Sequence, residues 1–109
     1  MSRTELLKGT LDLLILRTLE LEHRHGIGIA ERIEQITGGT FQIKPGSLFP
    51  ALHRLERDGF IRGAWSTSAE GRRIKSYQLT PEGHRQLTRE LDQWARVVLA
   101  VTQVLQAEE

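Results

Sequence analysis

The chain has 109 residues, of which 39% are hydrophobic, and this size suits one small domain rather than a two-lobed enzyme. A domain this short buries only roughly two-thirds of its unfolded surface, so a subunit interface would add to its stability. The absence of cysteine excludes a disulfide scaffold, a thiolate zinc site and a thiol nucleophile, and the formal net charge of +1 does not by itself indicate a nucleic-acid partner.

The first part of the chain predicts two helices. Ser2 and Glu5 form a capping box, because the serine can cap a helix while the glutamate returns to a free backbone amide. Leucine and isoleucine residues then recur at helical spacing, which extends the first helix to about Leu21. We expect a turn over residues 22–26, then a second helix marked by Ile29, Ile33 and Ile36 that ends at Gly38 and Gly39.

A third helix and a β-hairpin follow. Pro45 opens the helix, since proline is tolerated in a first turn. Leu48, Leu52 and Leu55 form its buried stripe, and Gly59 ends it. Residues 61–66 and 74–79 are short segments with β-branched and aromatic side chains around a polar, glycine-containing tip, which predicts a hairpin.

The last predicted element is a long helix that begins after Thr80 with a proline and an acidic first turn. Its apolar residues alternate in steps of four and three, which is typical of a heptad seam between two helices: Leu87, Leu91, Trp94, Val98, Val101 and Leu105. A helix of this length would extend roughly 42 Å, more than a small body needs for its own cover. We therefore expect residues 81–109 to be a dimerisation helix packed on a domain of residues 1–80.

The near-neutral total charge hides an uneven distribution. Residues 41–80 carry a charge of +4, whereas residues 1–40 carry −1 and residues 81–109 carry −2. The positive segment contains the third helix and the hairpin, where Arg72, Arg73 and Lys75 cluster with only Glu70 as a nearby counter-charge.

Motifs for catalysis, cofactor binding and metal binding are absent from the sequence. No phosphate-binding GxxxxGK[ST] loop is present, and the pair Gly26 and Gly28 lacks the third glycine and the preceding strand of a dinucleotide site. The histidines are scattered, and we interpret His23 and His25 as solvated residues of a polar turn. With no nucleophile paired to a base, we expect no enzyme activity, no cofactor and no metal.

A membrane location is also not expected. The apolar run at residues 13–16 is far shorter than the roughly 20 residues that span a bilayer. Glu5, Lys8 and Asp12 interrupt any signal-peptide core at the N-terminus. We expect a cytoplasmic protein with no membrane partner.

Three helices followed by a basic hairpin match a winged helix-turn-helix, whose third helix lies in the DNA major groove. The predicted fold class is therefore mainly α with a small β-hairpin: a winged helix-turn-helix plus a long C-terminal dimerisation helix. The buried stripe leaves other side chains on the surface of the third helix: Ser47, Phe49, Pro50, His53, Arg54 and Arg57. The alternative is a winged-helix adaptor that binds proteins instead of DNA, which would need no clustered basic hairpin.

Several motifs in order resemble the PadR family of bacterial transcriptional regulators, specifically its short members without a separate C-terminal domain. The segment PGSLFPALHRLERDG at residues 45–59 is similar to the family signature G-T-L-Y-P-x-L-x-x-L-E-x-x-G. The opening KGTLDLLIL at residues 8–16, then Trp65, GRR at 71–73 and YQLTPEG at 77–83 resemble the rest of the pattern. The resemblance covers nearly the whole chain.

This resemblance implies a homodimer, paired through the first and last helices, that represses transcription from a double-stranded DNA operator with two half-sites. It implies a recognition helix that contains Ser47, Phe49, Pro50, His53 and Arg54, and a wing that contains Arg72, Arg73 and Lys75. We predict that these residues, together with Lys44, bind DNA. Two positions depart from the family. Phe49 replaces the usual tyrosine and lacks its hydroxyl, and HGIGI at residues 25–29 replaces a more aromatic stretch.

Trp94 is the candidate ligand residue. In multidrug-sensing relatives, a tryptophan at the matching place lines a pore between subunits and stacks on flat aromatic drugs, which implies a small aromatic effector here. Because Trp94 also belongs to the heptad seam, packing at the dimer interface is the alternative role. Both roles are compatible.

Overall fold

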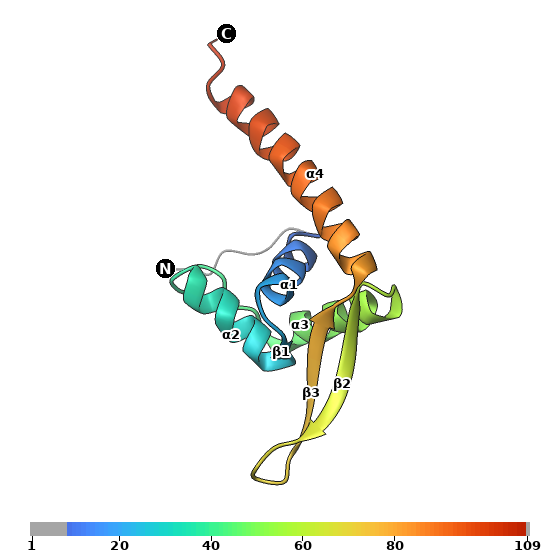
Figure 1. The fold of residues 1–109 in the computed structure, drawn as a ribbon. Helices are drawn as coiled ribbons and strands as arrows, with labels where there is room; N and C mark the ends of the chain where they lie inside the picture. Colours follow the sequence, from blue (N-terminus) through green and yellow to red (C-terminus); the bar gives the residue numbers. More distant parts are fainter. Residues whose placement is uncertain (1–8, 109) are drawn as a thin grey trace.

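Four helices and a three-stranded antiparallel sheet make up the fold in a computed structural model, which describes residues 9–108 (Figure 1). The helices are α1 (Thr10–Leu21), α2 (Gly26–Ile36), α3 (Pro45–Arg57) and α4 (Pro81–Leu105). The strands are β1 (Arg24–His25), β2 (Ile61–Thr67) and β3 (Arg73–Leu79). The predicted mainly α class with a small hairpin is confirmed, while the capping box at Ser2 and Glu5 lies outside the described residues.

The apolar stripes predicted for the first three helices meet in one core. Ile15, Leu16 and Leu19 of α1 are buried against Ile29 and Ile33 of α2, and the leucine stripe of α3 closes the cluster. Burial of each such side chain stabilises the fold by about 1.5–3 kcal/mol. The second and third helices end as predicted, at glycines with positive φ: Gly38, Gly39 and Gly59.

The segment expected to be a turn contains a short strand. Arg24 and His25 form β1, which pairs with Tyr77 and Ser76 of β3 and places β3 in the centre of the sheet. A strand of two residues shows no alternation, so no periodic signal in the sequence marks it. His25 also has a structural role that the interpretation as a solvated residue missed, since its Nδ1 accepts a hydrogen bond from the Gly28 amide at 3.1 Å and caps α2.

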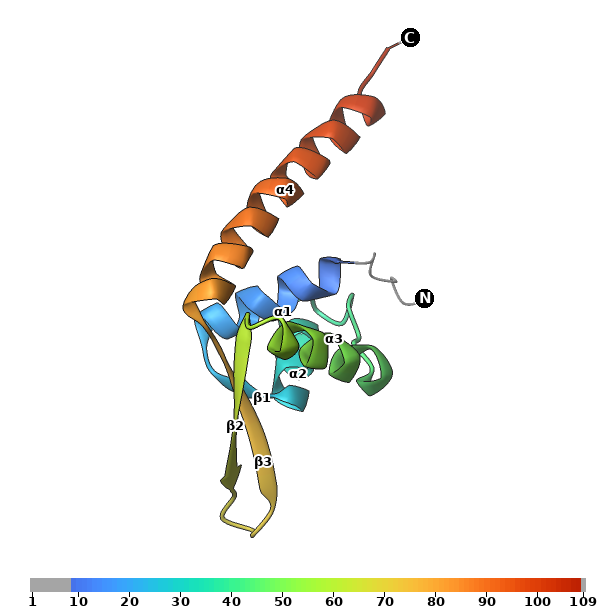
Figure 2. The ribbon, with the colours of Figure 1, turned by 90° about the vertical axis from the view of Figure 1, so that its right-hand side faces the viewer.

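The hairpin of β2 and β3, called the wing below, extends beyond the body of the three helices (Figure 2). Its strands pair from Ile61 opposite Leu79 to Thr67 opposite Arg73. Ile61 and Tyr77 are buried at the base of the wing, whereas most side chains near its tip are exposed. The wing is thus attached to the core at one end and free at the other.

Helix α4 starts at the base of the wing and runs away from the body (Figures 1 and 2). The Thr80 hydroxyl accepts a hydrogen bond from the Gly83 amide at 3.0 Å and donates one to the Gly59 carbonyl at 2.6 Å, so the cap also ties α4 to the end of α3. Gly83 and Leu87 are the buried residues of α4. Within residues 9–108, no helix combines the length and apolar character needed to cross a membrane.

Leu87 requires a correction to the predicted seam. Its side chain is 1% exposed and belongs to the core of its own chain, so it is not available to a second copy in the way its heptad position suggested. The reason is that the first turns of α4 pack on α1, and the same apolar spacing serves the core there. The exposed part of the seam begins at Leu91.

Replacement of Gly83 by alanine is expected to destabilise the protein by at least about 2 kcal/mol, toward the upper end of the range for overpacking. A Cβ at Gly83 would lie 2.0 Å from the backbone carbonyl oxygen of Phe60, which cannot move aside without shifting the chain. Denaturant unfolding at a fixed protein concentration measures the change. Gly46→Ala is the matched control, because a Cβ there meets nothing within 4 Å, and its midpoint should stay the same or rise. Equal effects of the two substitutions would contradict the close-packing explanation.

Candidate nucleic-acid interface

Helix α3 presents a continuous exposed face opposite its buried stripe. Leu48, Ala51, Leu52 and Leu55 are buried. The residues that the sequence analysis placed on the surface of this helix are all exposed: Ser47, Phe49, Pro50, His53, Arg54 and Arg57. The structure therefore brings the predicted DNA-reading side chains together along one solvent-facing surface.

The N-terminus of α3 adds positive potential to this face. Lys44 is the N-cap, makes no side-chain capping bond, and is exposed, while the first turn contains no acidic residue. The positive end of the helix dipole and the Lys44 ammonium thus point outward without an internal anion, an arrangement that favours a phosphate.

Arg54 has a partner inside the protein. Its guanidinium Nη2 lies 2.5 Å from Oδ1 of Asp12 in α1, and this hydrogen bond and charge raise the pKa of Arg54. Asp12 is largely covered, with a side chain 16% exposed, whereas that of Arg54 is 44% exposed. Arg54 was predicted as a surface residue that binds DNA, but its charge is balanced by Asp12 and the pair holds α3 against α1.

Lys75 is likewise paired, which corrects the expectation that only Glu70 opposes the basic residues of the hairpin. Its Nζ donates to Glu56 Oε1 of α3 at 2.8 Å, and Glu56 Oε2 accepts from the Gly63 amide of β2 at 3.3 Å. The Lys75 hydrogen bond lowers the pKa of Glu56 and raises that of Lys75. One carboxylate of α3 therefore bonds both strands of the wing and sets the position of the wing relative to the helix.

Gly63 makes this contact possible. A Cβ at this position would lie 2.2 Å from Cε of Lys75, so any larger residue would displace the lysine from Glu56. Neither Glu56 nor Gly63 was singled out from the sequence as a residue that positions the wing.

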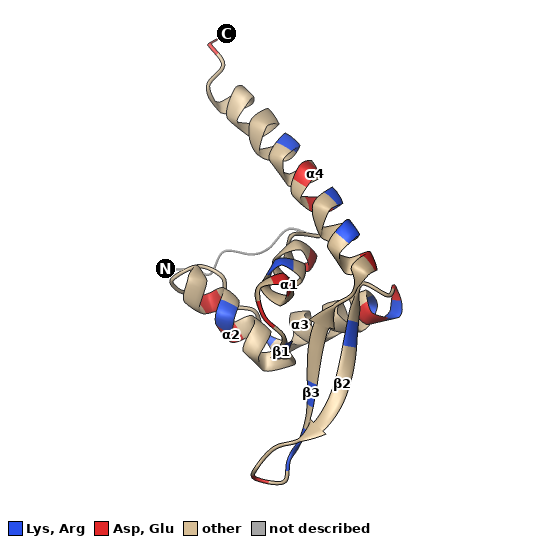
Figure 3. Ribbon diagram, in the orientation of Figure 1, with Lys and Arg blue, Asp and Glu red and all other residues tan. Residues whose placement is uncertain are grey.

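Arg72 and Arg73 near the tip of the wing have no carboxylate partner within residues 9–108. Arg72 and Arg73 are exposed, and none of the ion pairs within residues 9–108 involves them, Arg62 or Lys44. Basic positions extend from β2 to the tip in Figure 3, with one acidic position at the tip. The wing therefore retains a net positive charge that can attract an anionic partner.

Trp65 makes a cation–π contact with Arg73 of the wing. Its ring is on β2, and the guanidinium carbon of Arg73 lies 5.0 Å from the ring centroid, within the range of a cation–π interaction. Trp65 is 59% exposed, and the interaction orients Arg73 without removing its charge. Trp65 was predicted only as part of the family motif, and the hairpin pairing places it opposite Lys75.

Phe49 has a packing role at the junction of α2 and α3. Its ring is 44% exposed, and its Cε1 would lie 3.0 Å from a Cβ added at Gly26. The glycine at the start of α2 therefore allows the ring to approach the helix backbone.

The structure leaves most of the predicted seam of α4 uncovered. Leu91, Trp94, Val98, Val101 and Leu105 are between 43% and 79% exposed. Neighbouring apolar side chains on the same helix are exposed as well: Val97, Leu99 and Val104. No charged residue occurs between Arg96 and Glu108, so this end of α4 is an apolar surface rather than a solvated helix.

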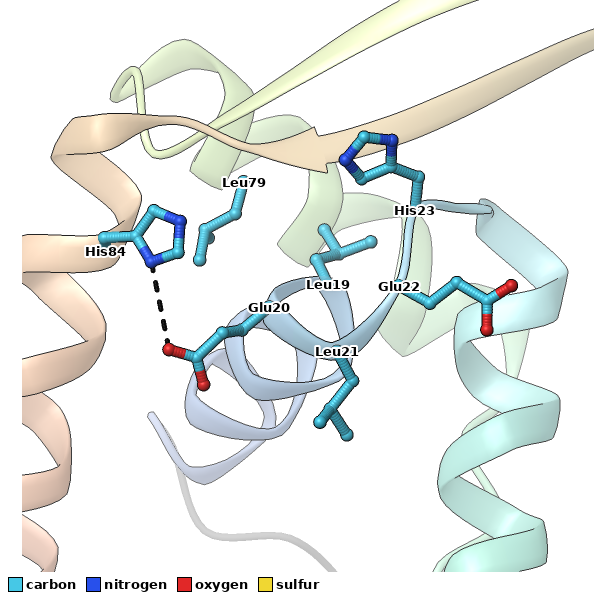
Figure 4. A pocket seen from close by; sticks show the side chains of 7 residues that line it. All are labelled: Leu19, Glu20, Leu21, Glu22, His23, Leu79 and His84. Atoms are coloured by element: carbon cyan, nitrogen blue, oxygen red, sulfur yellow. Dashed lines mark ion pairs between the residues drawn. The ribbon is translucent and has the colours of Figure 1, made fainter.

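Two hollows in the described part of the chain border α4. A groove of about 470 Å³ between α1 and α4 is lined by Gly9, Thr10, Leu13, Gln86, Arg89, Glu90, Gln93, Trp94 and Val97. A second hollow, of about 400 Å³, is lined by the residues in Figure 4, where His84 Nδ1 lies 3.8 Å from Glu20 Oε2. Within residues 9–108, no three histidine, aspartate or glutamate side chains are grouped to hold a metal ion.

The Glu56–Lys75 pair predicts an acid-sensitive contribution to stability. Glu56→Gln is expected to lower the free energy of unfolding at pH 7 by about 0.5–1 kcal/mol, the range of partly exposed ion pairs. Because the folded-state pKa of Glu56 is below its usual value of 4.5, this contribution is complete above that pH and disappears as the pH falls through the folded-state pKa. Urea unfolding of both proteins from pH 7 to pH 3 measures the difference, with the exposed Glu31→Gln as control. A difference that does not shrink on acidification would refute the prediction.

Three helices, a wing after the third helix and a cationic surface shared by both define a winged-helix protein of the helix-turn-helix class. Comparison with known families matches residues 15–89 to the transcriptional regulator PadR-like family. The match spans more than half of the chain, and the chain belongs to this family.

Individual relatives agree with this assignment. The transcriptional regulator Rv3488 of Mycobacterium tuberculosis is 36% identical over 69 residues, which are 61% of this chain and 64% of the relative. The crystal structure of a PadR family transcription regulator from Clostridium difficile is 31% identical with a TM-score of 0.77, covering 89% of this chain and 99% of that one. A PadR-like transcriptional regulator from Bacillus cereus is 30% identical with a TM-score of 0.80, covering 96% of this chain and 100% of the other. The protein is thus a transcriptional regulator and not an enzyme.

Proposed function

We propose that this PadR-like regulator binds double-stranded DNA, with α3 in the major groove and the wing on the adjacent backbone or minor groove. The observation that carries the proposal is the exposed face of α3 beside a wing whose Arg72 and Arg73 have no carboxylate partner in the described part of the chain. Arginines without internal partners are available to phosphates, which provide most of the affinity of such complexes.

In this proposal the residues divide into three groups by role. Ser47, Phe49, Pro50 and His53 face the bases, and Lys44, Arg72 and Arg73 contact phosphates. Arg54 and Lys75 act through their partners Asp12 and Glu56, which position α3 and the wing. The exposed wing arginines disfavour the alternative of a protein-binding adaptor, which has no use for them.

We also propose that the working unit is a homodimer, with residues 1–80 as the DNA-binding part and residues 81–109 as the dimerisation helix. The uncovered apolar surface of α4 supports this, because burying Leu91, Trp94, Val98, Val101 and Leu105 against a second copy removes them from water. A two-fold dimer would present two copies of α3 to two half-sites. The protein then acts in the cytoplasm as a repressor of neighbouring genes, released by a small aromatic ligand that binds at Trp94.

Salt dependence of DNA binding tests the proposal. Fluorescence anisotropy with a duplex from the promoter of its own gene should give an affinity that falls roughly a thousandfold between 50 and 200 mM salt. This estimate assumes about six phosphate contacts, from three cations in each of two protomers. A footprint of two half-sites would exclude the adaptor. An affinity that does not change with salt, or no preference for any duplex after selection from a random library, would overturn the proposal.

A further inference from the structure

One face of the wing carries both an exposed tryptophan and the link to α3. Side chains alternate between the two faces of a hairpin, so directly opposed residues share a face. Trp65 lies opposite Lys75, and Thr67 lies opposite Arg73, which places all four on one face. Because Lys75 bonds Glu56 of α3, this is the face of the wing that is turned toward α3. Trp65 and Arg73 are diagonal neighbours on it, within reach of each other's long side chains.

The Trp65 ring lies between two cations that differ in whether they are paired. Lys75 Nζ is 5.8 Å from the ring centroid, and the guanidinium carbon of Arg73 is 5.0 Å from it. Both distances are within the range of a cation–π interaction. The Lys75 charge is balanced by Glu56 at 2.8 Å, whereas none of the ion pairs within residues 9–108 uses Arg73. A column of contacts therefore runs from Glu56 through Lys75 and Trp65 to an unpaired guanidinium.

The backbone next to Arg73 is held by the turn at the tip of the wing. The Ser68 amide donates to the Arg72 carbonyl at 2.8 Å, and the Ser68 hydroxyl accepts from the Arg72 amide at 3.1 Å. Gly71 has a φ of +83°, a conformation that glycine adopts without strain, and its amide donates to the Ser68 carbonyl at 2.9 Å. The freedom that remains to Arg73 is thus in its long side chain, which is the part that contacts Trp65.

We propose that Trp65 is a positioning residue for DNA binding, which holds the Arg73 guanidinium ready for a phosphate while α3 occupies the neighbouring groove. This rests on the proposed function, which assigns Arg73 to a phosphate and gives Trp65 no part. Arginine loses much rotamer freedom when its side chain is fixed, and a contact that restricts it in the free protein reduces this loss on binding. The ring attracts the guanidinium without neutralising it, so a phosphate can still accept from its N–H groups.

A double-mutant cycle on DNA affinity tests this role. Trp65→Leu removes the ring but keeps an apolar side chain, and it should weaken binding to a promoter duplex roughly tenfold, as expected when two protomers each lose an exposed cation–π contact. In an Arg73→Ala background the same substitution should change the affinity by less than about twofold, because the ring then has no guanidinium to position. Fluorescence anisotropy at one moderate salt concentration measures all four affinities.

The matched control uses the neighbouring arginine. Arg72 is exposed like Arg73, but among the described residues it makes no cation–π contact. In an Arg72→Ala background, Trp65→Leu should therefore still weaken binding by roughly tenfold. Trp65→Phe keeps an aromatic face and should recover most of the affinity. Because Trp65 is 59% exposed, circular dichroism should show that all the variants are folded.

Nuclear magnetic resonance detects the contact in the absence of DNA. A proton over an aromatic face is shielded by the ring current, so the Arg73 Nε–H proton should resonate upfield in the wild-type protein relative to Trp65→Leu. The Arg72 Nε–H proton should show no such shift. An Arg73 resonance that does not respond to the loss of the ring would overturn the proposal.

The cycle overturns the proposal if Trp65→Leu weakens the Arg73→Ala and Arg72→Ala variants equally, since the ring would then support the wing as a whole. An unchanged affinity of Trp65→Leu alone would overturn it too. Either result with a wild-type complex that depends on salt would refute this role of Trp65 and leave the proposed function intact. A wild-type protein that binds no duplex would refute the proposed function, and this role with it, even if the resonance shift shows the contact.

Discussion

Substitution of Leu91 and Val98 by aspartate is expected to convert the proposed dimer to a monomer and to abolish the proposed binding to the promoter duplex. The two side chains are 46% and 44% exposed in the isolated chain, on the uncovered seam of α4. Burial of a large apolar side chain provides about 1.5–3 kcal/mol, and each residue occurs twice in a symmetric interface. The substitutions remove this free energy of burial and place carboxylates in the seam, so the dimerisation affinity should fall by well over a hundredfold.

Sedimentation velocity across the micromolar range measures this effect. Gln103→Asp introduces the same charge on the side of α4 away from the seam and should leave the dimer intact. Circular dichroism should show that both variants stay folded, since the substituted residues lie outside the core. A variant that still sediments as a dimer would refute the role assigned to the seam, as would a wild-type protein that is monomeric.

The double variant Arg72→Ala with Arg73→Ala is expected to weaken binding to all duplexes, specific and nonspecific alike. Neither residue is part of an ion pair in residues 9–108, and in a dimer the change removes four cations. If each contacts a phosphate, the slope of log affinity against log salt should become shallower by about 3 to 4. At low salt this corresponds to a loss of several orders of magnitude.

Two further variants test whether the loss of DNA affinity comes from phosphate contacts made by the wing. Arg96→Ala removes a cation of α4 that pairs with Asp92 at 2.8 Å, and it should leave the slope unchanged. His53→Ala removes an exposed side chain of α3 and should change the preference between sequences by about 1–3 kcal/mol rather than the slope. A wing variant with a wild-type salt slope would contradict phosphate contacts by the wing.

The helices and the wing could be predicted from the sequence because their signals are local. The spacing of Leu48, Leu52 and Leu55 defines the buried side of α3, and a proline and a glycine near its ends mark where it starts and stops. The exposed side of α3 follows from the same periodicity, so the surface proposed to read DNA could also be predicted. The two-residue strand β1 could not be predicted, because it forms only by pairing with the edge of β3.

The positions of the charges could not be predicted in this way. Arg54 and Asp12 are 42 residues apart, and Lys75 and Glu56 are 19 apart, so nothing in the local pattern pairs them. From the sequence alone, Lys75 and Arg54 were therefore interpreted as cations without partners. The fold turns them into links that orient α3 and the wing, and it leaves Arg72 and Arg73 among the cations that have no carboxylate partner within residues 9–108.

The sequence by itself determined the order of the elements, the class of fold and the family, because hydrophobic periodicity, caps and turn residues act over a few neighbouring positions. Tertiary structure decided which apolar and charged residues remain available for function. Leu87 and Leu91 are successive seam positions of one heptad pattern, yet Leu87 is in the core and Leu91 is in solvent. The physical reason is that burial and ion pairing depend on which elements meet in space, and α4 meets the body only along its first turns.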